Sequence, residues 1–269
     1  MTEKETKNNL KDIEEAMLEE TVKLDKDDGA REIVVLPEEE KKLEQLNLSD
    51  KNNEKKDIVS SWIPKTKLGR LVKAGKEKDL DKILSEGKKI LEPEILDVLL
   101  SLESDLLLIG QAKGKFGGGK RRVWRQTQKK TQEGNVLSFS SMVVVGDKNG
   151  HVGVGYGRSK ETLPAREKAI RQAKLNIIKI QRGFEDTIDT SSDPYTVPFK
   201  VEGKCGSVRI NLLPAPRGTG LAVADECKKI LRLAGIKDVY SITKGKTRTT
   251  FNLAKACVDA LSKTTMMRK

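Results

Sequence analysis

The spacing of apolar positions changes along the chain, from a helical period before residue 110 to alternation after residue 120. Within residues 58–110, apolar residues at helical spacing predict short helices over Leu68–Ala74, Asp79–Ser85 and Glu94–Leu100. Glycines close the first two, and Pro93 stands in the first turn of the third, where a missing N–H costs little. We expect this segment to be a helical extension.

Alternation after residue 120 predicts two strands joined by a short loop. The strands cover Arg121–Lys130 and Val136–Gly146, and the loop covers Thr131–Asn135. Odd-numbered residues of the second strand form one apolar face: Leu137, Phe139, Val143 and Val145. Asn149-Gly150 then predicts a two-residue hairpin turn, because both residues tolerate positive φ.

The return strand carries different residues on its two faces. Apolar residues alternate with glycines: Val152, Val154 and Tyr156 with Gly153, Gly155 and Gly157. This spacing inside a strand is not a dinucleotide fingerprint. Bare glycines allow close approach by a helix or a neighbouring chain, or by a nucleic-acid backbone, and the pattern leaves these interpretations open.

A helix is predicted from about Glu161, with Pro164 in its first turn. Its apolar stripe consists of Ala169, Ile170, Ala173, Ile177 and Ile180. Three strands and one helix predict a unit packed as two layers.

A polar segment, residues 183–194, separates this unit from a second one. Strands are predicted over Thr196–Glu202 and Ser207–Leu213, with a turn at Gly203–Gly206, and over Val239–Thr243. A helix is predicted between the last two strands, with Gly235 as its cap and an apolar stripe of Val223, Ala224, Cys227, Ile230, Leu231 and Ala234. The last predicted helix, Phe251–Leu261, turns four apolar residues inward: Phe251, Ala254, Val258 and Leu261. The order β-β-α-β-α suggests an α/β sandwich with a parallel strand pair, with Cys227 and Cys257 as core residues.

The net charge of +12 averages two unlike regions. Residues 1–57 have a net charge of −7 and no aromatic residue, whereas the rest of the chain has a net charge of +19. Such a tail buries too little apolar surface to offset its ordering entropy, so we expect it to be disordered. The tail either shields the basic body until its partner arrives or is a solvated, variable extension. The basic body indicates an anionic partner.

Composition excludes several classes of protein. No apolar run approaches the ~18 residues of a membrane span, and the first 20 residues contain seven acids, unlike a signal or transit peptide. Three cysteines without a C-x-x-C pair fit neither a disulfide framework nor a four-cysteine zinc site. His151 is the only histidine, and we expect a surface or hydrogen-bonding role for it. The sequence therefore predicts a cytoplasmic, non-catalytic protein without metal or cofactor.

A glycine-rich basic stretch, Gly114–Lys120, matches the first seven positions of a phosphate-binding P-loop. Position eight is Arg121, so the magnesium-binding hydroxyl is missing, and a strand follows where a P-loop needs a helix. Eight cations without an acid lie between Lys113 and Lys130. This favours a flexible arm along a phosphate backbone over an NTPase or a bare solvated face.

Two further loops are candidate anion sites. Arg217-Gly218-Thr219-Gly220 precedes a predicted helix, where Thr219 can cap and exposed amides favour an anion. Thr243–Thr250 repeats this pattern before the last helix, so we expect the two loops to lie near one another. The alternative for each is a plain connection from loop to helix.

Longer stretches resemble a known family. Ser138–Gly157, SFSSMVVVGDKNGHVGVGYG, and Glu161–Ala169, ETLPAREKA, resemble the signature of the universal small-subunit ribosomal protein five. Cys205–Val208 and Pro214–Leu221 resemble its C-terminal domain, and Trp62–Lys73, WIPKTKLGRLVK, is similar to the extension of archaeal and eukaryotic members. The resemblance covers about residues 60–269.

The resemblance implies an α+β fold: a double-stranded-RNA-binding-like β-β-β-α domain and a C-terminal α/β sandwich. It implies a ribosome-bound protein that binds 16S ribosomal RNA between body and head, near the mRNA entrance, and supports decoding accuracy. Partners would be the small-subunit proteins of families four and eight. The loop matching Gln126–Gly134 would reach the RNA of the neck, and Arg121, Arg122 and Arg125 would lie toward the mRNA entry side.

These inferences combine into one prediction with an alternative. The ranges expected are 1–57 for the acidic tail, 58–110 for the extension, 111–182 for the first domain, 183–194 for the linker and 195–269 for the second domain. Candidate RNA-binding residues are Lys113, Lys115, Lys120, Arg121, Arg122, Arg125, Lys129, Lys130, Arg158, Lys160, Arg217, Lys244, Lys246 and Arg248. The alternative function is a free double-stranded-RNA-binding regulator. Few aromatic residues, 4% of the chain, favour recognition of RNA shape and backbone over base stacking.

Overall fold

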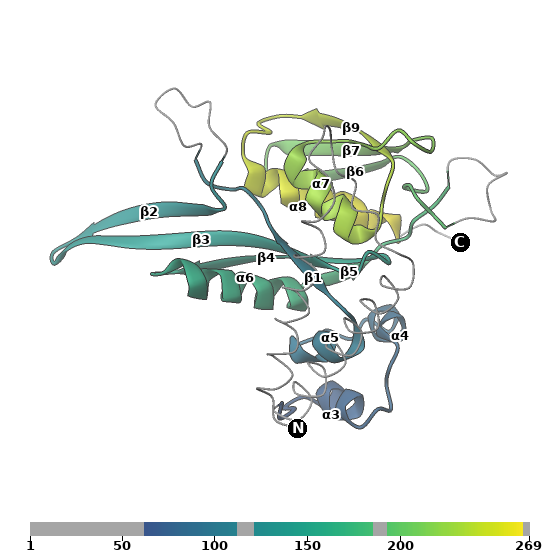
Figure 1. Cartoon of the computed structure of the whole chain (residues 1–269), viewed down its shortest axis with the longest axis horizontal. Coiled ribbons are helices and arrows are strands. Elements are labelled where there is room, and N and C mark those ends of the chain that lie inside the picture. The colour runs from purple at the N-terminus through teal and green to yellow at the C-terminus, as the bar shows by residue number, and fades with distance from the viewer. Residues whose placement is uncertain (1–61, 112–120, 185–192, 266–269) are drawn as a thin grey trace, which may run out of the picture. The chain divides into compact units, whose positions relative to one another are not determined.

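Helices and two β-sheets alternate as four layers in the part of the chain described here (Figure 1). The computed structural model describes residues 62–111, 121–184 and 193–265, all of which belong to the unit Asp50–Lys269. Helix α6 (Thr162–Leu175) covers one face of the first sheet, and helices α7 (Asp225–Ala234) and α8 (Thr250–Thr264) lie between the two sheets. The predicted acidic tail and the glycine-rich stretch Gly114–Lys120 lie outside the described residues.

The first sheet has five strands rather than the predicted three. They are β1 (Glu103–Leu106), β2 (Trp124–Thr131), β3 (Gly134–Gly146), β4 (His151–Ser159) and β5 (Ile177–Lys179). Their order is β1-β3-β4-β5. The edge of β3 that faces away from β4 has two partners, because residues 134–141 pair with β2 and residues 143–146 pair with β1. All these pairs are antiparallel. The predicted strand Arg121–Lys130 therefore starts three residues later, at Trp124.

Strand β3 is buried on both faces over its inner half. Val143 and Val145 pack against α6, as the predicted odd-numbered face requires. Met142 and Val144 on the opposite face belong to a large core cluster that also contains residues of α7, α8 and the second sheet. Alternation alone predicted only one buried face. The second face is covered by helices that follow at least some 80 residues later, which the local pattern cannot indicate.

Both turns of this sheet differ from the prediction. The loop expected over Thr131–Asn135 is a two-residue turn, since Thr131 pairs directly with Gly134. Consequently Gln126–Gly134 is mostly strand, not loop. In the next turn positive φ occurs at Lys148 (62°) and Gly150 (103°) rather than at Asn149. Asp147 shapes that turn, because its Oδ1 accepts hydrogen bonds from the N–H groups of Asn149 and His151.

The glycines of β4 face helix α6. A Cβ at Gly153, Gly155 or Gly157 would lie 2.0–2.2 Å from the backbone oxygens of Ala173, Ala169 and Ala165. The glycines therefore permit close helix–sheet packing, which decides between the two interpretations of their spacing. A nucleic-acid backbone cannot reach this face because α6 occupies it.

Helix α6 ends earlier than its apolar stripe suggested. It stops at Leu175, and Asn176 is its C-cap. Ile177 lies instead in β5, paired with Gly153, and Ile180 follows that strand and donates its N–H to Gly150. Both isoleucines are buried, so the apolar pattern predicted their burial correctly but wrongly placed them in the helix.

The extension contains the three predicted helices: α3 (Lys67–Lys73), α4 (Leu80–Ser85) and α5 (Glu94–Leu99). Gly75 and Gly87 follow the first two with φ near +70°, as expected for residues that end a helix. The helices share a core cluster that includes Trp62, Ile95 and, from β5, Ile177. The last residues of the extension are not helical, because Glu103–Leu106 forms β1 on the first sheet.

The second sheet has the order β6-β7-β9-β8. Its strands are β6 (Val201–Cys205), β7 (Val208–Pro214), β8 (Leu221–Ala222) and β9 (Val239–Lys244). The turn between β6 and β7 lies at Gly206-Ser207 rather than at Gly203–Gly206. The predicted parallel pair exists, but the short strand β8 forms it with β9. Helix α7 consequently begins at Asp225, after Val223 and Ala224, and Gly235 caps it as predicted.

Helices α7 and α8 carry the two core cysteines expected. Cys227 and Cys257 are both fully buried, and the hydrogen bond between them together with burial raises the pKa of the Cys257 thiol. Within the described residues no helix is long and apolar enough to span a bilayer.

Candidate nucleic-acid interface

Strands β2 and β3 extend beyond the rest of the first sheet as a two-stranded ribbon (Figure 1). Pairing between β3 and β4 begins only at Phe139, so Gly134–Ser138 pairs with β2 alone. Seven of the eight β2 residues are exposed, and Thr127 is half-buried. The ribbon thus presents both faces to its surroundings without a core of its own.

One face of the ribbon gathers cations from two strands. Arg125, Ser140 and Arg158 lie directly opposite one another across β2, β3 and β4, so all three share a face. Lys129 lies four residues along β2 and therefore on the same face. We call Arg125, Lys129 and Arg158 the ribbon face.

Hydrogen bonds fix the central cation of the ribbon face. The guanidinium of Arg158 donates to Ser138 Oγ at 2.8 Å from Nη2 and at 3.2 Å from Nε. Its Nη2 also lies 3.4 Å from Thr127 Oγ1, and Thr127 contacts Ser138 at 2.8 Å between the hydroxyl oxygens. Two hydroxyls thus hold an exposed guanidinium without neutralising its charge, which leaves it available to an anion.

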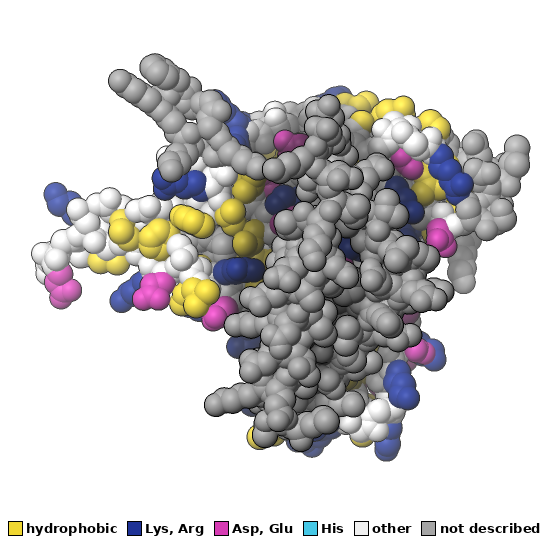
Figure 2. Space-filling model, in the orientation of Figure 1, with side chains coloured by type: hydrophobic (Ala, Val, Ile, Leu, Met, Phe, Trp, Pro, Cys, Tyr) yellow, Lys and Arg dark blue, Asp and Glu magenta, His cyan; other side chains and the backbone are white. Residues whose placement is uncertain are grey.

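Lys130 does not belong to the ribbon face. It pairs with Asn135 and lies on the opposite side of the ribbon, where Gln126 and Gln128 also project. Figure 2 shows basic side chains at the tip of the hairpin and again near the start of β2.

A second cluster of predicted cations lines a hollow of about 940 Å³, here called the loop hollow. Arg121 lines this hollow together with Lys246 and Arg248 of the loop before α8. Its Nη1 lies 3.5 Å from the Arg248 carbonyl oxygen. Asp225 and Glu226, in the first turn of α7, line the same hollow. This acidic turn counters the expectation that the start of α7 favours an anion.

Glu226 is buried in the wall of the loop hollow. Its Oε2 accepts the N–H of Leu108 at 2.8 Å. Burial raises the pKa of its carboxyl, although the Leu108 hydrogen bond and the charges of Lys229 and Arg121 act in the other direction. Lys229 itself is engaged, because its ammonium donates to the Leu106 carbonyl at 2.7 Å and to Asp105 at 3.1 Å.

The two candidate anion loops do not come together. Gly220 adjoins Val239 at the start of β9, whereas Lys244 ends that strand, which separates the loops by roughly 17 Å. Thr219 caps no helix, since its hydroxyl donates to the Pro216 carbonyl. Arg217 stacks over the ring of Tyr195, 5.1 Å from its centroid. The prediction of neighbouring loops is therefore wrong.

The remaining predicted cations are scattered. Lys244 lies on the outer face of the second sheet beside Arg209 and Lys204, two residues that the sequence did not single out. Lys160 is exposed after β4, and the Arg122 backbone pairs with Gly110 and Gln111. Lys113, Lys115 and Lys120 lie outside the described residues.

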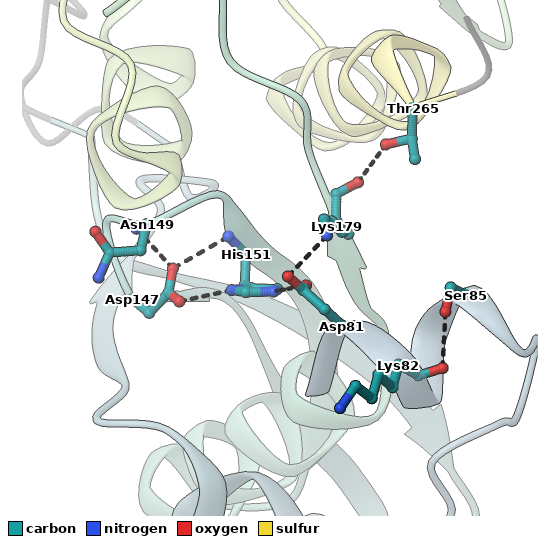
Figure 3. Close-up of polar contacts among 8 residues, drawn as sticks. All are labelled: Asp81, Lys82, Ser85, Asp147, Asn149, His151, Lys179 and Thr265. Atoms are coloured by element: carbon teal, nitrogen blue, oxygen red, sulfur yellow. Dashed lines mark hydrogen bonds and ion pairs between the residues drawn. The ribbon is translucent and has the colours of Figure 1, made fainter. Parts of the chain in front are cut away.

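The histidine is buried rather than exposed and lies between two carboxylates (Figure 3). Its Nδ1 is 2.6 Å from Asp147 Oδ2, and its Nε2 is 2.9 Å from Asp81 Oδ1 on α4. Lys179 of β5 forms an ion pair with the same Asp81 at 2.7 Å. His151 thus joins the extension to the sheet by hydrogen bonds, as one of its two expected roles requires.

Charge is nearly balanced around His151. Burial opposes protonation of the imidazole, but the hydrogen bonds to Asp147 and Asp81 outweigh burial and raise the pKa of His151. Burial likewise opposes ionisation of Asp81 and Asp147. Contacts with Lys179 and His151 nevertheless lower the pKa of Asp81, and hydrogen bonds from His151 and from the Asn149 N–H lower the pKa of Asp147. No group of three or more histidine, cysteine or acidic side chains that could hold a metal ion occurs among the described residues.

Comparison with known proteins gives two matches along the chain. The model of ribosomal protein S5, N-terminal domain, matches residues 123–181, and that of ribosomal protein S5, C-terminal domain, matches residues 203–269.

Curated relatives match over most of their length. The small ribosomal subunit protein uS5 of Nanoarchaeum equitans is 51% identical over 211 residues, 78% of this chain and 90% of that protein. The uS5 protein of Hyperthermus butylicus is 45% identical over 77% of this chain and 92% of its own. That of Methanococcus maripaludis is 42% identical over 82% of this chain and 92% of its own.

Proposed function

The chain belongs to the ribosomal protein S5 family, and from this membership we propose that it is a structural, non-enzymatic constituent of the small ribosomal subunit that binds 16S ribosomal RNA. The ribbon face is the observation that carries the RNA-binding part of the proposal. It presents Arg125, Lys129 and Arg158 on one exposed surface, and no described carboxylate forms an ion pair with them.

The character of the ribbon suits folded RNA. Arginine and lysine side chains bind phosphates, and the hydroxyls of Thr127 and Ser138 hold Arg158 in place for such a contact. A narrow, two-stranded element can enter between RNA helices where a layered domain cannot. The order β2-β3-β4-α6 also supports the double-stranded-RNA-binding-like description of this half.

The loop hollow supports a second RNA contact. Arg121, Lys246 and Arg248 line it together with the carboxylates of Asp225 and Glu226, so these cations outnumber the acids. Together the two cationic surfaces would position RNA near the mRNA entrance between body and head. Contacts with the small-subunit proteins of families four and eight and a contribution to decoding accuracy belong to the same proposal.

A free double-stranded-RNA-binding regulator is the competing function. It would use the first sheet and α6 alone, and it would not require the second sheet. The shared core weighs against such independence, because Met142 and Val144 of β3 pack with residues of α7 and α8.

Sedimentation of the endogenous protein through a sucrose gradient tests the choice. The ribosomal function predicts that the protein migrates with the 30S peak at moderate salt and leaves it only at high salt. A protein found mostly outside that peak at moderate salt would contradict the ribosomal function and favour the free regulator. A variant with Arg125, Lys129 and Arg158 changed to Gln should leave the peak at lower salt than the native chain.

A further inference from the structure

A hollow of about 590 Å³ lies beside the free edge of β4, and we call it the edge hollow. Strand β5 pairs with β4 only at residues 151–153, so no described strand covers the edge of β4 from Val154 onward. The end of α6, strand β5 and helix α8 close the hollow around this edge. Its size lies within the range of small-ligand pockets.

Backbone N–H and C=O groups of β4 point toward the edge hollow. The Asn176 amide reaches the Val154 carbonyl oxygen at 3.4 Å, which shows that this carbonyl points outward from the sheet. Because strand residues alternate, the N–H and C=O of Tyr156 point outward as well. The hollow thus offers a donor and an acceptor next to an apolar wall that includes Val154 and Ile178.

An aromatic ring and a cation stand together at the edge hollow. Tyr156 is 37% exposed, and its ring is fixed edge-to-face on Phe251 of α8 with centroids 4.7 Å apart. The Lys255 ammonium lies 5.4 Å from the centroid of that same Phe251 ring. Arg158 of the ribbon face lies two residues along β4 on the same side as Tyr156, about 7 Å away.

The charge at the edge hollow is positive. Asp259 is its acidic residue, and the Lys204 N–H and the Lys263 ammonium, each at 3.0 Å, already bind that carboxylate. Lys255 forms no ion pair with any described carboxylate. A ligand here would therefore combine a planar group for the ring with a negative group for Lys255.

We propose that the edge hollow receives one unpaired nucleotide of the bound RNA, with its base stacked on Tyr156 and its phosphate on Lys255. The proposal rests on the RNA-binding function above and names a site within it. RNA that follows the ribbon face reaches the hollow without leaving that side of β4. A base inside a duplex cannot enter a concave site, so the hollow selects a bulged or single-stranded nucleotide.

An added peptide strand is the other ligand that a free sheet edge can bind. The edge hollow favours the nucleotide, because its uncompensated charge is a cation and its exposed side chain is an aromatic ring. A peptide strand would need neither of them. The experiments below separate the two ligands.

Fluorescence of 2-aminopurine tests the stacking. The probe is an RNA stem with a single bulged 2-aminopurine, compared with the same stem in which that base is paired. The full-length protein should bind the bulged stem about tenfold more tightly and quench its fluorescence. Tyr156→Leu, which keeps an apolar side chain without the ring, should lose both the preference and the quenching but still bind the paired stem.

Tyr240→Leu is the matched control, because Tyr240 is a similarly exposed tyrosine (45%) on β9. It should behave like the native chain. Equal binding of both stems by the native protein, or unchanged quenching by Tyr156→Leu, would overturn the nucleotide site. Failure of the native protein to bind either stem would instead contradict RNA binding itself, so the two failures are distinguishable.

Photo-crosslinking identifies the ligand in assembled subunits. A photoreactive benzoylphenylalanine is placed at position 156 of the full chain, and subunits are irradiated after purification. A crosslink to ribosomal RNA supports the nucleotide site. A crosslink only to another protein would overturn it in favour of an added strand.

Discussion

The two halves of strand β3 have opposite surroundings although they belong to one continuous strand. The outer half, Gly134–Phe139, is exposed or half-buried and pairs mainly with β2. The inner half, Ser140–Gly146, is buried on both faces between α6 and the layer of α7 and α8. The inner half holds the outer half in position, because the ribbon has no core that could do so itself.

This difference assigns stability and binding to separate stretches of the same sheet. Residues packed on the inner half should control the free energy of unfolding with little direct effect on RNA. Residues of the ribbon face should control RNA affinity with little effect on unfolding. Each prediction below tests that separation.

Gly155→Ala should have the largest effect of the substitutions proposed here. It should lower stability, because Gly155 pairs with the inner half of β3. The new Cβ would lie 2.1 Å from the Ala169 carbonyl oxygen and 2.2 Å from the Ala173 nitrogen, so α6 must move off the sheet. We expect a loss of about 3 kcal/mol in the free energy of unfolding, measured by urea denaturation.

Gln128→Ala is the control for this substitution, since Gln128 is exposed on the ribbon. It should change stability by less than about 0.5 kcal/mol. A Gly155→Ala protein as stable as the native one would mean that the packing of α6 on the glycines is not tight.

Changing Arg125, Lys129 and Arg158 to Gln should have the next largest effect, on the ribbon face. Loss of three phosphate contacts should weaken RNA binding at least about tenfold and reduce the slope of log K against log salt by about 3. The free energy of unfolding should stay within about 0.5 kcal/mol, because none of the three side chains is buried. Filter binding at several salt concentrations measures both the affinity and the slope.

A matched variant removes the same charge from the other side of the sheet. Arg166, Lys168 and Arg171 are exposed on α6, which covers the opposite face. Changing them to Gln should leave the salt slope nearly unchanged. A reduction equal to that of the ribbon variant would show that net charge, and not the ribbon face, determines binding.

The sequence predicted the parts of this comparison that depend on local pattern. Alternation located β3 and β4, and the spacing of the glycines marked a face without side chains. Strand β5 was missed because Ile177 and Ile180 continue the helical spacing of Ala173, and only pairing with Gly153 ends that pattern. Strand β8 was missed because two residues carry no period.

The candidate site was less predictable than the fold because it depends on register. The sequence of β2 is enough to place Arg125 and Lys129 on one face of that strand. That Arg158 lies beside them could be learned only from the pairing of β2 and β4 with β3 at Ser140. The role of Lys255 could not be predicted, because its ammonium lies over the Phe251 ring, and the tyrosine that packs on this ring, Tyr156, is 95 residues away in the chain. Conversely, the two glycine-rich anion loops looked alike in sequence but lie at opposite ends of β9.

His151→Gln should destabilise the protein less than Gly155→Ala, and its effect should depend on pH. The folded state raises the pKa of His151 above its ordinary 6.5, so the stabilisation is complete below that pH and declines as pH rises through the raised value. Asp81 and Asp147 have lowered pKa values, so their contribution is complete above the ordinary 3.8 and is lost in acid. We expect the variant to be less stable by about 1.5 kcal/mol near pH 5.5 and by less near pH 9.

Urea denaturation at several pH values measures this difference, with Asn149→Ala as a control in the same turn. Asn149 donates only its backbone N–H to Asp147, so its side chain can be removed without disturbing the pair of carboxylates. RNA binding of His151→Gln should equal that of the native chain at each pH, because His151 lies at the inner end of the sheet. A stability deficit that stays constant from pH 5.5 to 9 would show that His151 acts as a neutral hydrogen-bonding group. A parallel loss of RNA affinity would show that the inner and outer halves are coupled through the extension.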